Sequence, residues 1–288
     1  MERPLVSIVV FTYNSSKYIL ETLDSIKIQQ YTNIELVVCD DCSKDETYSI
    51  VLSWLSLNEK RFKRAILIKS IRNMGTCYNY SLGVSNSTGV YIKTLDGDDC
   101  LNGIDAISCY VDFMENNNTQ ICISDVELFS EEGEDLSKER DWYDYILKCE
   151  SEDLEHQKQR ICKELSIADP GMFFTRELFD SVGGFSTNYK LLEEWPFFYS
   201  TIMSGHQIVV LSQRLVRYRI NPKSVSHCNI SPTFVQLQKD LARFFWKIRL
   251  KELLKSGKVV ESIYEAIHTT KALFASIFRL YYNKVKSN

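Results

Sequence analysis

Short apolar runs that alternate with helical patterns limit this chain to an α/β fold. The first run, residues 6–11, is nearly continuous and rich in β-branched residues, which is typical of a strand buried on both faces. Similar runs follow at residues 34–39 and 65–68, with helical apolar spacing between them. Ser15 or Ser16 is a candidate cap for the first of these helices. Strand, helix and strand in this order predict βαβ units in a mostly parallel sheet flanked by helices.

An acidic cluster follows a fourth apolar run, residues 90–94. In Leu95-Asp96-Gly97-Asp98-Asp99, three carboxylates lie within four residues, beside a glycine that permits close approach of the backbone. Like charges at this spacing raise each other's pKa, and a divalent cation together with a diphosphate would remove that cost. The pattern favours a metal–diphosphate site at a strand end. The alternative is a polar turn, in which Asp and Gly are common.

Three predicted strands end in polar residues, after Phe11, at Asp40-Asp41 and at Asp96. In parallel α/β sheets, ligands bind beyond the carboxyl ends of the strands. We therefore expect these residues to line one crevice. The chain contains neither G-x-G-x-x-G nor a Walker A lysine motif, which argues against dinucleotide enzymes and P-loop NTPases.

Composition excludes several other classes. Hydrophobic residues make up 44% and charged residues 25%, as in ordinary globular proteins, and no apolar run approaches the roughly 18–20 residues of a membrane span. Nine scattered cysteines predict reduced thiols in the cytoplasm. The Cys39-Asp40-Asp41-Cys42 motif lacks a second ligand pair, so we expect no zinc or redox site there.

Further along the chain, residues 104–114 and 176–182 are predicted helices, and 121–123 and 172–174 are predicted strands. Residues 127–155 carry twelve acidic and three basic residues, which indicates a solvated loop or short helices. Glu193-Glu194-Trp195 opens an apolar helix over residues 196–203. Carboxylates are favourable at a helix N-terminus, so the pair has a structural explanation, with Trp195 as a core residue.

Charge is distributed unevenly along the chain. Residues 231–288 carry eleven Lys/Arg and four Asp/Glu, a net charge of +7, whereas the first 230 residues have a net charge of −11. Two amphipathic helices are predicted in this tail, at about 233–255 and 259–284. A basic, apolar tail favours peripheral contact with an anionic membrane. The alternative is packing on the catalytic domain or on another subunit. Nucleic-acid binding is not expected, because the body of the protein is acidic.

Taken together, residues 6–14, 37–43, 73–75, 89–99, 183–185 and 193–195 resemble the family 2 inverting glycosyltransferases with the GT-A fold. The resemblance covers about residues 5–227, with the motifs in the family's order and spacing. It implies a catalytic domain at 1–230, with a nucleotide-binding half at about 1–100 and an acceptor half at about 101–230, and a C-terminal helical appendage at 231–288.

The resemblance implies roles for the residues of the nucleotide-binding half. Phe11 and Tyr13 are expected to pack against the base and ribose of the donor. Asp41 matches the residue that pairs with uracil, which favours a UDP-sugar. Asp96 and Asp98 match the D-x-D element that binds ribose and diphosphate through Mn²⁺ or Mg²⁺. Asp99 is expected near that metal.

In the acceptor half, Glu194 matches the general base, although the family normally has Asp there. Glu193 and Trp195 are expected to line the sugar and acceptor pocket. Where the family often has Ala-Arg-Asn, this chain has Cys77-Tyr78-Asn79, and Arg72 is a candidate to replace the missing arginine. Residues 218–227 resemble a flexible segment over the donor, in which His227 is a candidate contact to diphosphate or metal.

The implied function is a metal-dependent inverting glycosyltransferase at the inner face of the membrane. It would use a glycan or lipid-linked acceptor in the synthesis of surface polysaccharide. A catalytically silent nucleotide-sugar binding module is the alternative, motivated by the departures at Glu194 and Tyr78. A sugar nucleotidyltransferase is disfavoured, because the glycine-rich, basic N-terminal loop of that class is absent.

Overall fold

The computed structural model describes residues 3–136, 152–163, 170–220, 231–255, 257 and 259–286. Within these residues, eight strands form one sheet in the order β3-β2-β1-β4-β7-β6-β8-β5. The strands are β1 (Val6–Thr12), β2 (Ile34–Asp40), β3 (Arg64–Lys69), β4 (Tyr91–Asp96), β5 (Cys100–Leu101), β6 (Ile121–Phe129), β7 (Met172–Thr175) and β8 (Val209–Arg219). The neighbours among β1 to β4 are parallel, whereas β7 is antiparallel to β4 and β6. The predicted α/β architecture is confirmed.

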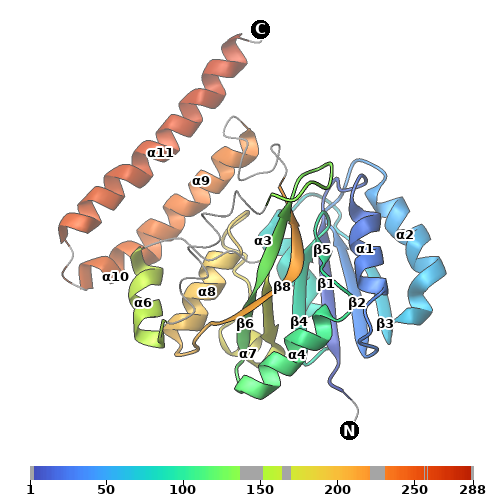
Figure 1. Ribbon diagram of the computed structural model, residues 1–288. Helices are drawn as coiled ribbons and strands as arrows, with labels where there is room; N and C mark the ends of the chain where they lie inside the picture. The colour runs from blue at the N-terminus through green and yellow to red at the C-terminus, as the bar shows by residue number, and fades with distance from the viewer. Residues whose placement is uncertain are drawn as a thin grey trace.

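Helices cover both faces of this sheet (Figure 1). One face carries α1 (Ile19–Lys27), α2 (Thr47–Asn58) and α4 (Ala106–Asn117). The other face carries α3 (Thr76–Ser85), α6 (Leu154–Lys163), α7 (Arg176–Ser181) and α8 (Glu194–Met203). A 3₁₀ turn, η1 (Glu59–Arg61), follows α2.

Alternate residues of the central strand contribute to two separate cores. In β1, Ile8 and Val10 belong to the cluster with α1, α2 and α4, whereas Val9 and Phe11 belong to the cluster with α3, α7 and α8. Successive side chains of a strand point to opposite faces, so a sheet covered on both faces requires a continuous apolar run. Each fully buried aliphatic or aromatic side chain stabilises the fold by about 1.5–3 kcal/mol.

The parallel register brings three strand ends to one edge of the sheet. Phe11 of β1 lies opposite Asp96 of β4, and Thr12 lies opposite Asp40 of β2. The N–H of Gly97 donates to the main-chain oxygen of Phe11 at 2.8 Å. A Cβ at Gly97 would lie 2.9 Å from the Cβ of Thr12, so this close packing requires glycine. The predicted convergence of the strand ends is confirmed.

Two local predictions differ in part from the structure. α1 begins at Ile19 rather than at a cap on Ser15 or Ser16, because the main-chain oxygen of Ser15 accepts the N–H groups of Tyr18 and Ile19 in a preceding turn. The acidic segment 127–155 does not begin as a loop or short helix, since β6 extends to Phe129. Residues 137–151 of that segment lie outside the described residues.

Residues 209–219 form the strand β8, which pairs in parallel with β6. The expectation that Tyr218 and Arg219 belong to a flexible segment is therefore wrong. Hydrogen bonding along β6 holds both residues in the sheet, with Tyr218 opposite Leu128 and Arg219 opposite Phe129. His227 lies outside the described residues.

The tail forms the two predicted helical stretches. α9 (Pro232–Phe244) continues through a π-helical turn, η4 (Phe245–Arg249), into α10 (Leu250–Lys255), and α11 (Val259–Lys286) follows. Phe244 is buried in the core cluster that contains α8, and Leu237 and Leu241 pack against that cluster. α9 therefore packs on the body of the protein, and α11 lies along α9 (Figure 1). None of the helices in the described part of the chain has the length and apolar composition needed to cross a membrane.

Candidate active site

The loops that follow β1 and β2 hold each other in place at the carboxyl edge of the sheet. Asn14 adopts a left-handed conformation with φ +54°, and its N–H donates to Ser43 Oγ at 2.9 Å. Its Oδ1 accepts the N–H of Lys44 at 2.8 Å. Tyr13 precedes this bridge and is 45% exposed. Its ring is therefore accessible at the edge where the donor base was expected.

Asp41 organises the loop that follows β3. It is 3% exposed, and its two carboxylate oxygens accept the N–H groups of Met74 and Gly75, each at 2.8 Å. Burial raises the pKa of the Asp41 carboxyl, although the two N–H groups and the charge of Lys190 oppose that shift. Asp41 thus fixes the loop that also carries the exposed side chain of Arg72. Its pairing with uracil stays a prediction.

Phe11 is a core residue rather than a surface for a base. Its ring is 5% exposed and stacks on Tyr80 with a centroid distance of 3.6 Å and an interplanar angle of 15°. The Tyr80 hydroxyl donates to Asp96 Oδ1 at 2.8 Å. Because Tyr80 covers the ring, the expectation that the Phe11 side chain packs on the nucleotide is corrected. Phe11 supports Tyr80, and Tyr80 orients Asp96.

Arg219, at the end of β8, binds two residues of the acidic cluster 96–99. Its N–H donates to Asp99 Oδ1 at 2.9 Å, and its Nε donates to the main-chain oxygen of Asp98 at 2.9 Å. Its guanidinium also pairs with Glu21 and lies 4.4 Å from the ring centroid of Tyr18. The side chain is almost fully buried, so these contacts fix the backbone of the cluster in one geometry.

Asp98 is a candidate ligand for a metal ion. Burial raises the pKa of its carboxyl, with the charge of Arg219 acting in the opposite direction, so a second cation would stabilise the ionised form. Within the described residues, no group of three or more His, Cys, Asp or Glu could hold a metal ion alone. Mg²⁺ is commonly bound through one or two carboxylates plus substrate phosphates. The residues present fit an ion shared between Asp98 and a bound diphosphate.

The Glu193–Glu194 pair lies at the same edge of the sheet. Glu193 Oε2 accepts the hydroxyl of Thr76 at 2.7 Å, and Thr76 begins α3 directly after the loop that Asp41 orders. Glu194 is the first residue of α8 and is half-buried. Trp195 is 8% exposed and belongs to a core cluster, so the structure favours the core alternative for it over the sugar pocket.

Three further residues contribute to this edge and were not singled out from the sequence: Thr76, Tyr80 and Arg219. The β-branched and aromatic residues of 209–219, three valines and a tyrosine, are the signal that could have placed Arg219 on a strand. Tyr78, which stands where the related sequences often have arginine, is 38% exposed on α3.

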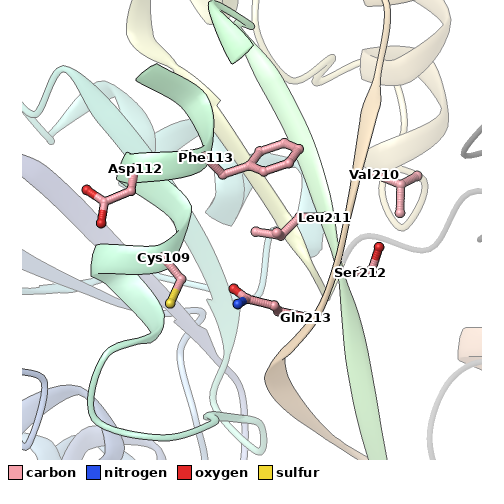
Figure 2. Close-up of a pocket in the computed structure, with 7 residues that line it drawn as sticks. All are labelled: Cys109, Asp112, Phe113, Val210, Leu211, Ser212 and Gln213. Carbon is pink, nitrogen blue, oxygen red and sulfur yellow. The ribbon is translucent and has the colours of Figure 1, made fainter. Parts of the chain in front are cut away.

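A shallow pocket of about 450 Å³ lies between α4 and β8, away from these residues. Figure 2 shows its lining from the two elements: Cys109, Asp112, Phe113, Val210, Leu211, Ser212 and Gln213. β7 is antiparallel to both β4 and β6, and β8 is parallel to β6, so β8 runs in the same direction as β4. The first residues of β8 therefore lie toward the amino edge of the sheet, opposite the edge that carries the candidate site residues. None of the candidate site residues lines this pocket.

Comparison with known proteins identifies the family. Residues 7–183 match Glycosyl transferase family 2, which is more than half of the chain. The chain belongs to this family of inverting glycosyltransferases.

Curated relatives match over shorter segments. One, an uncharacterised glycosyltransferase of Rickettsia prowazekii, is 40% identical over 96 residues, which cover 33% of this chain and 28% of that protein. Another, UDP-Glc:alpha-D-GlcNAc-diphosphoundecaprenol beta-1,3-glucosyltransferase WfaP of Escherichia coli, is 36% identical over 95 residues, covering 33% of this chain and 36% of that protein. The chain spans about a third of the length of these curated relatives.

Solved structures share the fold. The S. aureus TarS fragment 1–349 in complex with UDP-GlcNAc has a TM-score of 0.61 at 19% identity and covers 92% of this chain and 81% of its own. The mannosyltransferase PcManGT of Pyrobaculum calidifontis, in complex with GDP-Man and Mn²⁺, has a TM-score of 0.64 at 18% identity. The match covers 98% of this chain and 76% of that chain. These likenesses confirm the GT-A type of fold.

Replacing Arg219 with Met should reveal how strongly it fixes the acidic cluster. The substitution leaves the main-chain oxygen of Asp98 and the Glu21 carboxylate without this donor. Since Glu21 is partly exposed, we expect the free energy of unfolding to fall by about 2 kcal/mol in urea denaturation. Arg214→Met, on the same strand but with a side chain that is 46% exposed, is the control and should cost less than about 1 kcal/mol. Equal losses in the two variants would contradict the role assigned to Arg219.

Proposed function

We propose that this protein transfers a sugar, with inversion, from a nucleoside-diphosphate donor to an acceptor hydroxyl during synthesis of a surface polysaccharide. A UDP-sugar is the favoured donor, and the acceptor is a glycan or a lipid-linked saccharide. The observation that carries the proposal is the arrangement at the carboxyl edge of the sheet. The parallel register brings Asp41 and Asp96 to one edge, and the Thr76–Glu193 hydrogen bond brings the start of α8 to the same edge.

Donor binding follows from the chemistry of these groups. The exposed ring of Tyr13 is available to stack on a base, and the N–H of Asp41 donates to the main-chain oxygen of the preceding residue, Thr12. The choice of UDP rests on Asp41 alone. Among the proteins with the same fold, TarS was solved with UDP-GlcNAc and PcManGT with GDP-Man. Arg72 is the positively charged side chain in the loop ordered by Asp41, and it is proposed to contact the phosphates.

Asp98, with Asp96 and Asp99 beside it, is the group proposed to hold Mn²⁺ or Mg²⁺. When bound, such an ion would act as a Lewis acid that stabilises negative charge on the departing diphosphate. The protein's own contribution is to hold Asp96 and Asp99, the acidic residues on either side of Asp98, in place. Tyr80 holds Asp96 and Arg219 holds Asp99, so the cluster needs little rearrangement when the donor binds.

Glu194 is proposed as the general base. An acceptor hydroxyl is a poor nucleophile, and a carboxylate on the side opposite the leaving group can take its proton as the new bond forms. A single displacement of this kind inverts the anomeric centre and needs no second nucleophilic carboxylate. The position at the N-terminus of α8 stabilises the ionised form of Glu194 through the helix dipole. Glu193, held by Thr76, is proposed to line the acceptor side.

Glu194→Gln should abolish most turnover while leaving donor binding intact. The amide preserves size but cannot accept the proton, so we expect kcat to fall by about 10²–10⁴-fold. Donor affinity, measured by calorimetry with UDP and Mn²⁺, should match that of the wild type. Glu177→Gln, on the exposed face of α7, is the control. Near-normal turnover in the Glu194 variant would show that another group is the base.

Asp98→Asn should remove the contribution of the metal to donor binding. The amide is a neutral, weaker ligand, so the increase in UDP affinity produced by Mn²⁺ should be lost, while metal-free affinity changes little. Titration calorimetry with and without Mn²⁺ measures this difference. Asp180→Asn, exposed on α7, should behave as the wild type. If Mn²⁺ strengthens UDP binding equally in the Asp98 variant, the ion is held elsewhere.

A nucleotide-sugar binding module without catalysis is the second candidate, motivated by Glu in place of Asp at position 194. Glu has one more methylene than Asp, which moves its carboxylate relative to the acceptor. Release of UDP from a panel of UDP-sugars by the purified protein separates the two candidates. Binding without any release or transfer would favour the module.

We further propose that α11 attaches the protein to an anionic membrane surface. One face of this helix exposes apolar side chains at spacings of three and four residues: Val260, Ile263, Tyr264, Ile267, Phe274, Ile277 and Phe278. α11 lies at the outer side of the tail and extends beyond the body (Figure 1). The net charge of +7 over residues 231–288 complements anionic headgroups, and such helices lie in the interface with their apolar face buried.

Phe274→Glu/Phe278→Glu should release the protein from vesicles. The wild type should co-sediment with vesicles that contain phosphatidylglycerol at low salt, because apolar burial and charge attraction act together. The double variant should stay in the supernatant. Leu52→Glu/Leu57→Glu, which alters exposed leucines on α2, is the matched control and should still bind. Absence of wild-type binding would contradict the proposal. If sedimentation velocity shows that the wild type is a dimer and the double variant is a monomer, the apolar face of α11 binds a second copy of the chain instead.

A further inference from the structure

A buried carboxylate of the tail holds the loop that leads into Glu194. Asp240 on α9 is 4% exposed, and its Oδ2 accepts the N–H groups of Lys190 and Leu191, each at 2.8 Å. Its Oδ1 accepts Gln236 Nε2 at 3.1 Å. Hydrogen bonds from main-chain N–H groups to a buried carboxylate are strong and restrict geometry. Leu191 is only three residues from Glu194, so little chain remains to absorb a displacement.

The neighbouring turn of α9 makes two more contacts to the same loop. Arg243 Nη1 donates to the main-chain oxygen of Asn188 at 2.6 Å. The ring of Phe244 meets that of Tyr189 edge-on, with a centroid distance of 6.1 Å. The tail helix therefore contacts the loop through a carboxylate, a guanidinium and an aromatic ring.

The opposite side of the loop contacts the start of α3. The main-chain oxygen of Lys190 accepts the N–H of Cys77 at 3.3 Å, and the N–H of Leu192 donates to Cys77 Sγ at 3.2 Å. At Gly75, where φ is +94°, a Cβ would lie 2.4 Å from Lys190 Cγ and 2.5 Å from Lys190 O. Gly75 is also one of the two residues whose N–H groups bind Asp41. The loop thus lies between the tail and the donor-side loop.

We propose that Asp240 is a positioning residue for the transfer reaction, which makes α9 part of the active-site framework. This inference rests on the function proposed above. Asp240 fixes residues 190 and 191, and these fix the first turn of α8, which carries Glu194. The same loop packs on Gly75, so the tail also supports the loop that Asp41 orders. Asp240 acts through the main chain and needs no contact with substrate.

Asp240→Ala and Asp240→Asn test this role together. The alanine variant should lower kcat by about 10²-fold, since a misplacement of about 1 Å has this effect, while UDP affinity measured by calorimetry changes little. The asparagine variant, whose amide oxygen can accept the same two N–H groups, should recover most of kcat. Hydrogen exchange at the amides of Lys190 and Leu191 should accelerate in the alanine variant alone. Turnover is measured with the most active of UDP-glucose, UDP-GlcNAc and GDP-mannose, at a temperature where thermal melts show every variant folded.

Lys239→Ala, exposed on the same helix, is the matched control and should retain wild-type kcat and exchange. Wild-type kcat in Asp240→Ala despite faster exchange at Lys190 and Leu191 would overturn the positioning role. Unchanged exchange would show that Asp240 does not hold the loop. If the wild type turns over none of these donors, the proposed function fails, and the exchange result then decides separately whether the Asp240 contact orders residues 190 and 191.

Discussion

The parallel pairing of β1 with both β2 and β4 is the constraint on which the rest of the structure depends. All seven residues of β1 are buried, and the five apolar ones divide between the two cores on the faces of the sheet. A shift of one residue in register would turn every side chain of β1 to the opposite face of the sheet. Each core would then receive the side chains that belong to the other. The same register fixes which residues meet at the carboxyl edge, because Phe11 lies opposite Asp96 and Thr12 opposite Asp40. The apolar packing of the strands thereby determines where the polar groups converge.

Around this edge, buried carboxylates repeatedly bind main-chain N–H groups of loops that come from elsewhere in the chain. Asp41 binds the loop after β3, Asp99 binds the end of β8, and Asp240 binds the loop before α8. A buried carboxylate is costly unless its oxygens have donors, and a loop N–H is costly unless it has an acceptor. Each pairing satisfies both requirements at once. The consequence is an edge of the sheet whose loops are held by long-range contacts rather than by their own local structure.

The sequence alone was sufficient for the alternating α/β pattern, the succession of strands β1 to β4 along the chain and the meeting of polar and acidic residues at their ends. Those features depend on local apolar runs and on the handedness of βαβ units, which are properties of short segments. Prediction failed where a segment's partner was remote. Three arginines in residues 209–219 obscured β8, and their place on a strand becomes intelligible only beside their partners Glu21, Asp125 and Glu127. Ser15 and Ser16 suggested a helix cap, but their N–H groups bind the side chains of Thr47 and Asp45, and a turn separates them from the start of α1 at Ile19.

What the sequence by itself determined is therefore the family, the sheet and the set of carboxylates from which a donor site could be built. The tertiary structure decided how those groups are used. It removed Phe11 and Trp195 from the candidate surface, because Tyr80 stacks on one ring and a core cluster encloses the other. It also brought in Arg219, which lies 120 residues from Asp99, and Asp240, which lies 50 residues from Lys190. Hydrogen bonds between such distant segments depend on the packing of the whole sheet and its helices, and no local pattern encodes them.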